Sequence, residues 1–359
     1  DKEKLGGICL NWGCIPTKAL LKNAEVYHTI KHADTYGIKV ENVSVDFKKN
    51  IQRSRDISNR LSKGIEFLMK KNKITHITGI GKLTSKTSLK VKNKQKTDTI
   101  EADKIILATG ARPKSFPGME FDGNRVISFK EAMILDSPPK KMIIIGSGAI
   151  GSEFAYYYNE FGTEVHLIEM MDRILPVEDS DVSKEVAKSF KKSGIIISTK
   201  TKVSKIESLK TKVKVHTEKN GKEEILEGDM ALLAVGVTGN IENIGLEELG
   251  IITDRGAITI NEFNQTNIPT IYAIGDVSGP PWLAHVASAQ GHVAADHTAG
   301  HSPKPVDYTN IPGCTYCQPQ VGSLGMTEAQ AKESGHDVKI GKFLFQASGK
   351  AMAVGDTTG

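Results

Sequence analysis

The sequence is poor in cysteine and aromatic residues, and it has no long apolar run. Its 359 residues include four Cys, two Trp and only 6% aromatic side chains. So few cysteines do not make the disulfide scaffold of a small secreted domain, and a reducing compartment fits better. No run is long enough to span a bilayer, and residues 1–4 do not resemble a secretory signal. We therefore expect a cytoplasmic protein with no membrane segment.

An excess of charge of one sign is also lacking. The formal net charge is +5, and 25% of the residues are charged. Lysines gather between residues 48 and 73 and again between 82 and 96. A solvated helix face and a solvated hairpin explain them more simply than a nucleic-acid surface does, so we expect no nucleic-acid partner. The hydrophobic content of 39% is that of a globular protein, and the length predicts two or more domains.

The stretch G-G-I-C-L-N-W-G-C-I-P-T-K at residues 6–18 is the first motif. Apolar residues at helical spacing predict a helix over 17–31, so Cys14 lies at or just before its N-terminus. There the helix dipole favours a thiolate, and the short loop brings Cys9 within disulfide range of Cys14. Two buried structural thiols are the alternative. The glycines, the helix start and Lys18 one turn further on favour a redox dithiol.

A second pattern combines a strand, a glycine loop, a helix and another strand. Apolar residues over 141–145 predict a strand, G-S-G-A-I-G follows at 146–151, and a helix to about residue 161 leads to a strand over 164–168 that ends at Glu169. The first glycine permits a tight turn, the second lets a pyrophosphate reach the helix N-terminus, and the third allows close packing. The predicted NAD ligands of this unit are Gly146, Gly148, Ala149, Ile150, Gly151 and Glu169.

Glu169 distinguishes between the two nicotinamide cofactors. An acidic residue at the end of the second strand accepts hydrogen bonds from ribose hydroxyls. Its charge repels a 2′-phosphate and no arginine replaces it, since Arg173 is expected to be peripheral. The sequence therefore predicts NAD rather than NADP. A glycine-rich crossover that binds no ligand is the alternative.

Further elements are expected on both sides of this unit. The patterns predict helices over 47–71, 182–193, 284–299 and 327–334, strands over 74–78, 88–92, 98–101, 105–107, 195–197, 231–236 and 266–276, and a hairpin around Asn220-Gly221. Cys314 and Cys317 form a C-x-x-C pair, but no two further ligands accompany it at zinc spacing. We expect structural thiols and no metal site, with a second redox pair as the alternative.

Two stretches carry a family resemblance. L-N-W-G-C-I-P-T-K-A-L-L at 10–21 resembles the redox-active signature of the pyridine nucleotide–disulfide oxidoreductases, and T-N-I-P-T-I-Y-A-I-G-D at 266–276 resembles their second FAD motif. The resemblance implies an α/β fold with two Rossmann-like nucleotide-binding domains and the start of an α/β dimerisation domain. The implied divisions are FAD-binding domain, 1–112 and 237–307; NAD-binding domain, 113–236; and dimerisation domain, 308–359.

The resemblance also implies roles for individual residues. Cys9 would exchange with a dithiol substrate, Cys14 would contact the flavin, and Lys18 would pair with Glu153 next to the flavin N5. The implied FAD ligands are Lys18, Gly81, Thr109, Gly110, Asp276 and Ala284, and backbone near Val203 and Gly236 is implied to line the NAD site. From the residues alone, the glycines fit turns equally well. Asp276 alone would be read as a turn aspartate, and Glu153 as a glutamate on a helix surface.

The implied reaction is oxidation of dihydrolipoamide to lipoamide at a Cys9–Cys14 disulfide, with electrons passing through FAD to NAD⁺. The implied partners are dihydrolipoamide or the lipoyl domain of a 2-oxo acid dehydrogenase or glycine cleavage complex, and a second copy of the chain. A sister reductase for glutathione or mercuric ion, and a non-catalytic NAD-binding module, are alternatives. The family's first FAD glycine loop and its His–Glu acid–base pair have no match, so we expect a chain shortened at both ends.

Overall fold

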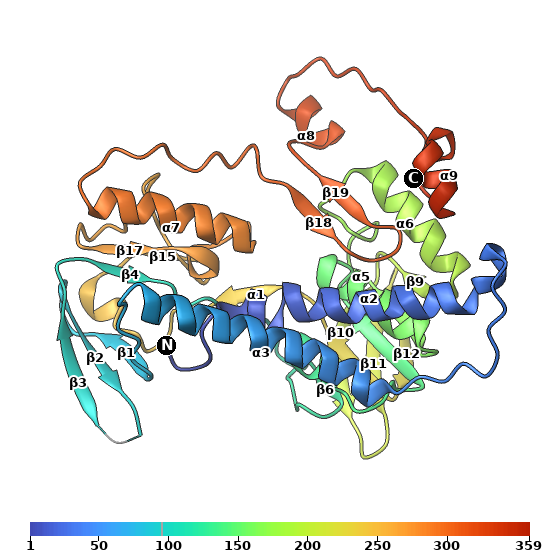
Figure 1. Cartoon of the computed structure of the whole chain (residues 1–359), viewed down its shortest axis with the longest axis horizontal. Helices are drawn as coiled ribbons and strands as arrows, with labels where there is room; N and C mark the ends of the chain where they lie inside the picture. The colour runs from blue at the N-terminus through green and yellow to red at the C-terminus, as the bar shows by residue number, and fades with distance from the viewer. Residues whose placement is uncertain (95) are drawn as a thin grey trace. The chain divides into compact units, whose positions relative to one another are not determined.

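The computed structural model describes residues 1–94 and 96–359, which form two compact units; Figure 1 labels many of their helices and strands. Unit 1 consists of Asp1–Cys14, Asp56–Pro113 and Val237–Tyr308, and unit 2 consists of Ile15–Arg55, Lys114–Gly236 and Thr309–Gly359. Both units combine helices with sheets, so the α/β fold class is confirmed. No helix in the described part of the chain is long and apolar enough to cross a membrane.

Unit 1 is built from small sheets. Its strands are β1 (Ile80–Leu83), β2 (Ser88–Lys92) and β3 (Thr97–Glu101) in one antiparallel sheet, the parallel pair β4 (Ile105–Leu107) and β17 (Ile271–Ala273), and the antiparallel pairs β5 (Ala111–Pro113) with β14 (Val237–Gly239) and β15 (Thr253–Asp254) with β16 (Ala257–Ile258). Its helices are α1 (Gly7–Trp12), α7 (Ala284–Thr298) and the C-terminal part of α3 (Phe47–Lys71), with 3-10 turns at Glu247–Leu249 and Gly275–Ser278.

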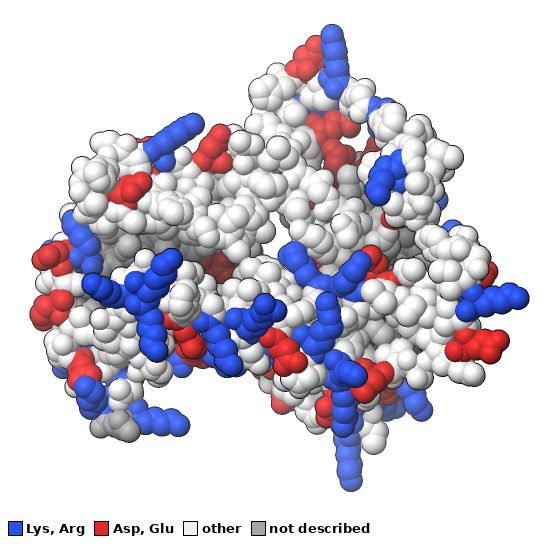
Figure 2. All heavy atoms as spheres, in the orientation of Figure 1, with Lys and Arg blue, Asp and Glu red and all other residues white. Residues whose placement is uncertain are grey.

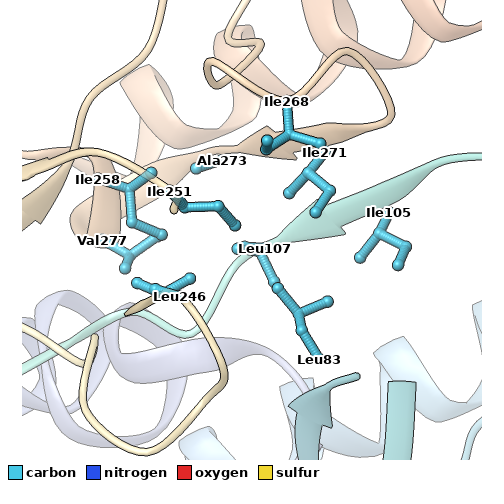
Figure 3. Close-up of a cluster of buried hydrophobic side chains, with 10 residues drawn as sticks. All are labelled: Leu83, Ile105, Leu107, Leu246, Ile251, Ile258, Ile268, Ile271, Ala273 and Val277. Atoms are coloured by element: carbon cyan, nitrogen blue, oxygen red, sulfur yellow. The ribbon is translucent and has the colours of Figure 1, made fainter. Parts of the chain in front are cut away.

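The core of unit 1 gathers around β4 and β17, as Figure 3 shows. Its buried side chains are Leu83, Ile105, Leu107, Leu246, Ile251, Ile258, Ile268, Ile271, Ala273 and Val277. Burial of each large aliphatic side chain contributes roughly 1.5–3 kcal/mol relative to exposure. The core holds β4 beside β17 in parallel register, so that the segments following both strands leave the same edge.

The centre of unit 2 is a five-stranded parallel sheet in the order β6-β13-β7-β8-β9. Its strands are β6 (Val126–Ile127), β7 (Lys141–Ile145), β8 (Glu164–Ile168), β9 (Ile196–Ser198) and β13 (Met230–Leu233). The helices of this unit are α4 (Phe129–Ala132), α5 (Ala149–Glu160), α6 (Ser180–Lys192), α8 (Glu328–Glu333), α9 (Gly349–Val354) and nearly all of α2 (Cys14–Lys31), with the N-terminal part of α3 and 3-10 turns at Ala33–Tyr36 and Phe345–Ala347. The strand and helix of the predicted glycine-loop unit are therefore β7 and α5.

Two antiparallel elements complete unit 2. A three-stranded meander comprises β10 (Lys202–Ser208), β11 (Val213–Lys219) and β12 (Lys222–Gly228), and a hairpin comprises β18 (Gly313–Thr315) and β19 (Val321–Ser323). The turn between β11 and β12 places Asn220 and Gly221 at φ 52° and 75°, as a two-residue hairpin turn with left-handed residues requires. The hairpin predicted at Asn220-Gly221 is confirmed.

Most predicted elements are confirmed, some to the residue. The helix over 47–71 and the strands over 88–92, 105–107, 141–145 and 164–168 have the predicted bounds. The strand predicted over 74–78 is wrong: that segment has no regular structure, and Ile74 and Ile77 are 53% and 37% exposed. β-Branched residues alone do not make a strand, and no strand of the described residues pairs with this segment. The strand expected over 266–276 is limited to Ile271–Ala273.

Candidate active site

Cys9 and Cys14 form a disulfide within unit 1, with 4.7 Å between their Cα atoms. Cys9 lies in α1, and Cys14 is the first residue of α2, three residues earlier than the helix start predicted. Gly13 joins the two helices, and a Cβ there would lie 3.1 Å from Cys9 Cα. Glycine is favoured here, because a Cβ would be in tighter contact than most Cβ atoms in proteins. The prediction that Cys14 lies at a helix N-terminus is confirmed, and the dipole there stabilises a thiolate.

Tyr316 contacts both Lys18 and Glu153 in unit 2. The Lys18 ammonium lies 4.2 Å from the centroid of the Tyr316 ring. The Tyr316 N–H donates a 2.8 Å hydrogen bond to Glu153 Oε1. Burial raises the pKa of Glu153, while the Tyr316 N–H and the charge of Lys18 lower it. Within the described residues, Lys18 and Glu153 interact through their charges and through Tyr316 rather than by a direct ion pair.

The three glycines of the loop between β7 and α5 differ in the space around the position of a Cβ atom. Gly146 has φ +96°, and a Cβ there would lie 2.4 Å from Ala234 O. A Cβ on Gly151 would lie 1.9 Å from Gly146 O, so both positions exclude a side chain because of packing. A Cβ on Gly148 would meet no protein atom within 4 Å. Gly148 therefore leaves open space in front of Ala149, the first residue of α5, where free helix N–H groups attract a phosphate.

Glu169 follows β8 and reaches back to the glycine loop. Its Oε2 accepts hydrogen bonds from Ser147 N (2.9 Å) and Ser147 Oγ (2.7 Å), and its Oε1 accepts one from Met171 N (2.9 Å). A carboxylate has about four acceptor sites, and hydrogen bonds within the described residues fill three of them. Glu169 is only 8% exposed. The sequence predicted this residue but not Ser147, which the G-x-G-x-x-G pattern leaves unspecified.

The FAD candidates of unit 1 gather where β4 and β17 end. Thr109 and Gly110 follow β4, and Asp276 lies in the 3-10 turn after β17. The Thr109 hydroxyl donates to Asn240 O over 2.8 Å, and Asn240 N donates to Gly110 O over 2.9 Å. The carboxyl ends of neighbouring parallel strands are the usual ligand edge of an α/β sheet. Burial raises the pKa of Asp276.

Helix α7 begins at Ala284 and is fastened to the turn after β17. Gln290 Oε1 accepts a 2.6 Å hydrogen bond from Gly275 N, and its Nε2 donates to Tyr308 Oη over 2.8 Å. This clamp holds the Asp276 turn against α7. The sequence motifs do not identify Gln290, whose signal is an amide side chain among the apolar and small residues of the predicted helix.

The remaining candidates lie in paired strands or at a strand end. Gly81 lies in β1 opposite Val91. Val203 lies in β10 and packs against the apolar cluster of unit 2. Gly236 follows β13 at φ +100°, and its carbonyl accepts a hydrogen bond from Lys114 N. Of these, only Gly236 lies close in sequence to Ala234, whose carbonyl packs against the glycine loop.

The C-x-x-C pair is divided between two environments. Cys314 in β18 is exposed, whereas Cys317 is completely buried and its thiol donates to Pro319 O over 3.2 Å. Burial, followed by the charge of Glu153, raises the pKa of Cys317 to about 12. No cluster of three or more potential metal ligands occurs in residues 1–94 and 96–359. The arrangement is that of one buried structural thiol and one surface thiol.

We expect the two free cysteines to differ sharply in reactivity. Treating the native, unreduced protein with iodoacetamide should modify Cys314, while Cys317 should react only after unfolding, because burial keeps its thiol neutral and inaccessible. Peptide mass spectrometry before and after addition of guanidinium measures both. Equal labelling of the two positions in the native protein would contradict the structure.

The fold and the site first define a class: an α/β oxidoreductase with a dinucleotide-binding glycine loop and a disulfide at a helix N-terminus. A family model for pyridine nucleotide-disulphide oxidoreductases matches residues 3–291, and the model of that family's dimerisation domain matches residues 311–359. The chain belongs to the pyridine nucleotide-disulphide oxidoreductase family. The family predicted from the two motifs is thereby confirmed.

Curated relatives and solved structures agree with this assignment. The chain is 46% identical to the dihydrolipoyl dehydrogenases of Rhizobium etli and Zymomonas mobilis, covering 100% of this chain and 78% of theirs. The crystal structure of LpdA from Mycobacterium tuberculosis has a TM-score of 0.93 at 25% identity, again covering 100% of this chain and 78% of that one. The flavoprotein disulfide reductase RclA from Escherichia coli has a TM-score of 0.85 at 27% identity over the same shares of both chains.

Proposed function

We propose that the chain oxidises dihydrolipoamide to lipoamide and reduces NAD⁺, with FAD as the carrier between them. The Cys9–Cys14 disulfide at the start of α2 is the observation that supports this most directly. Relatives that are 43–46% identical over the whole chain are named for this activity. FAD and NAD are the cofactors of the family.

The disulfide accepts electrons through two thiol–disulfide exchanges. One substrate thiolate attacks the sulfur of Cys9 and releases Cys14 as a thiolate, which the helix N-terminus stabilises. The second substrate thiolate attacks the mixed disulfide, so that lipoamide leaves with a new S–S bond and Cys9 becomes a thiol. FAD, when bound, supplies the redox chemistry that passes the two electrons to NAD⁺ as a hydride equivalent. The chain's own residues hold Cys9 and Cys14 within disulfide distance and orient the cofactors, so that the two reduced cysteines can be reoxidised.

The remaining site residues divide by cofactor. We assign FAD contacts to Lys18, Gly81, Thr109, Gly110, Asp276 and Ala284, and NAD contacts to Gly146, Gly148, Ala149, Ile150, Gly151, Glu169, Val203 and Gly236. Lys18 and Glu153 supply charge beside the reacting ring. The matching domain assignment gives 1–112 and 237–307 to FAD, 113–236 to NAD and 308–359 to the dimer interface.

The glycine loop fits a dinucleotide. Gly148 has open space where any other residue would place a Cβ, and protein packing does not require a glycine there. Gly146 and Gly151, by contrast, are required by backbone atoms of the loop and of Ala234. A pyrophosphate lying against the start of α5 explains why the middle position is also glycine.

Two matched substitutions separate binding from folding in this loop. Gly148→Ala should weaken NADH binding by about tenfold or more, since a methyl group enters the pyrophosphate space, while the free energy of unfolding changes little. Gly151→Ala should destabilise the protein by roughly 2 kcal/mol or more, because its Cβ would overlap a carbonyl. Urea unfolding and NADH titration of both variants measure the two effects. If Gly148→Ala bound NADH as the parent does, the loop would not be the NAD site.

We further propose a cytoplasmic homodimer that takes its substrate as free dihydrolipoamide or as the lipoyl domain of a 2-oxo acid dehydrogenase or glycine cleavage complex. The match to the dimerisation domain supports self-association. On the face shown in Figure 2, basic and acidic side chains are interspersed, and we propose no nucleic-acid partner.

A substrate comparison tests the proposed reaction. The FAD-loaded protein should reduce NAD⁺ with dihydrolipoamide and show little activity with glutathione disulfide or mercuric ion in the presence of NADPH. Glu169 opposes the NADPH-dependent alternatives, since its negative charge would repel the 2′-phosphate of NADPH. Higher turnover with either of the other two substrates would replace the proposal with a sister reductase, and no turnover with any of them would favour an NAD-binding module.

A further inference from the structure

We propose that Tyr316 is a positioning residue for the Lys18–Glu153 pair: its ring places the ammonium, and its backbone N–H places the carboxylate. The inference rests on the proposed function, in which these two charges lie beside the flavin. Tyr316 belongs to the segment matched by the dimerisation-domain model. Neither the sequence motifs nor the family match assigns it a part in the reaction.

The lysine side of the contact depends on the aromatic ring. Helix α2 is fixed near Lys18, because Pro16 O accepts a 3.0 Å hydrogen bond from Ser54 Oγ and Ala19 O accepts one of 3.1 Å from Arg53 Nη1. The backbone of α2 is therefore held in place here, and the rotamer of the Lys18 side chain determines the position of its ammonium group. At 4.2 Å from the centroid of Tyr316, the ammonium lies within the range of a cation–π interaction.

The ring also closes one direction in which Lys18 would otherwise move. Lys18 and Tyr316 line a pocket of about 230 Å³ together with Leu21, Lys22, Glu25, Tyr156, Gln318 and Gln320. Glu25 lies in that pocket and pairs with Lys22 over 2.6 Å. Without the aromatic face, the Lys18 ammonium loses its 4.2 Å contact with the ring and gains rotamers that carry it away from Glu153. The ring keeps the positive charge where the proposed reaction needs it.

The glutamate side of the contact depends on the backbone of the hairpin. Glu153 Oε1 accepts its hydrogen bond from Tyr316 N, and the residues around Tyr316 are held firmly. Thr315 and Cys317 are 4% and 0% exposed, and Gln318 bonds through its side chain to Asp356. Tyr316 is thus fixed to α5 from one side while its ring reaches α2 from the other.

The phenol hydroxyl takes no part in this arrangement. The pKa of Tyr316 is raised first by burial and then by the neighbouring Cys314 thiol, with which its side chain is hydrogen-bonded, and Glu153 contributes last. The hydroxyl therefore interacts with Cys314, whereas the ring face and the N–H serve Lys18 and Glu153. Phenylalanine retains both of those features, and leucine retains only the N–H.

The test compares Tyr316→Leu with Tyr316→Phe in the FAD-loaded protein. Tyr316→Leu should lower kcat by about tenfold, leave KM for NADH within about twofold, and weaken the long-wavelength thiolate–flavin absorbance of the two-electron-reduced protein. Tyr316→Phe should restore both the absorbance and the rate. Tyr27→Leu is the matched control, because it removes another Lys–Tyr contact of α2, that of Lys31 at 4.8 Å, and should leave the absorbance unchanged.

Three outcomes overturn the inference: an unchanged spectrum and kcat in Tyr316→Leu, a Tyr316→Phe variant as impaired as Tyr316→Leu, or the same loss of absorbance in Tyr27→Leu. Cys14→Ser, measured in parallel, keeps this result separate from the proposed function. If Cys14→Ser is inactive and Tyr316→Leu behaves as the parent does, only the inference fails. If Cys14→Ser still oxidises dihydrolipoamide, the proposed function itself fails.

Discussion

Cys14→Ser is expected to abolish dihydrolipoamide-dependent NADH formation, a loss on the order of 10³-fold or more, as for other residues that act covalently. Without Cys14, the first exchange at Cys9 has no disulfide to attack, and no dithiol remains to receive two electrons. The measurement is steady-state turnover of the FAD-loaded variant at saturating dihydrolipoamide, with the flavin content determined for every preparation.

Cys314→Ser is the matched control for that experiment. Cys314 is an exposed thiol outside the disulfide, and serine retains a hydroxyl that can meet the Tyr316 side chain. Turnover in this variant should stay within about twofold of the parent, as for most surface substitutions. Full activity in Cys14→Ser, or an equal loss in both variants, would refute the role assigned to the Cys9–Cys14 pair.

Glu169→Gln is expected to reduce the preference for NADH over NADPH by about tenfold or more, the equivalent of about 1.4 kcal/mol. The substitution removes the negative charge that repels a 2′-phosphate and leaves the side-chain size unchanged. Glutamine retains an oxygen for the two hydrogen bonds from Ser147 and loses the one from Met171 N. The ratio of kcat/KM for the two cofactors is the quantity to measure.

The control for charge is Glu164→Gln at the opposite end of β8. Glu164 begins β8 and forms a surface ion pair with Lys141 over 2.8 Å, a contact of small energetic value. Removal of the Glu164 charge should leave the ratio of kcat/KM for NADH and NADPH unchanged. The assignment of Glu169 to the ribose would be untenable if both variants, or neither, changed the ratio.

Local sequence patterns predict the structure correctly where neighbouring residues alone determine it. The apolar run before the glycine loop, the helix over 47–71 and the Asn220-Gly221 turn each depend on neighbouring residues, and each is confirmed. The helix predicted over 327–334 is likewise set by neighbouring residues, since Thr327 caps α8 in a capping box with Gln330. The two long motifs are specific enough to identify the family by themselves, because each combines many residues at fixed spacing.

Contacts between residues far apart in the chain cannot be predicted from local sequence patterns. Tyr316 meets Lys18 and Glu153 from nearly 300 and more than 160 residues away, and no spacing rule connects such positions. Helix α1 was missed because Gly6 and Gly7 are turn residues by propensity, although the chain begins a helix at Gly7. The segment over 74–78 shows the opposite error: its β-branched residues favour a strand, but no strand of the described residues pairs with it.

Electrons are expected to pass between a pyridine nucleotide and the Cys9–Cys14 disulfide. Thiol trapping measures this most directly: the FAD-loaded protein is incubated anaerobically with NADH, treated with iodoacetamide and mapped by mass spectrometry. We predict new labels on Cys9 and Cys14 after NADH, few after an equal concentration of NADPH, and none without a nucleotide. An intact, unlabelled Cys9–Cys14 disulfide after full exposure to NADH would show that this pair does not exchange electrons with the nucleotide.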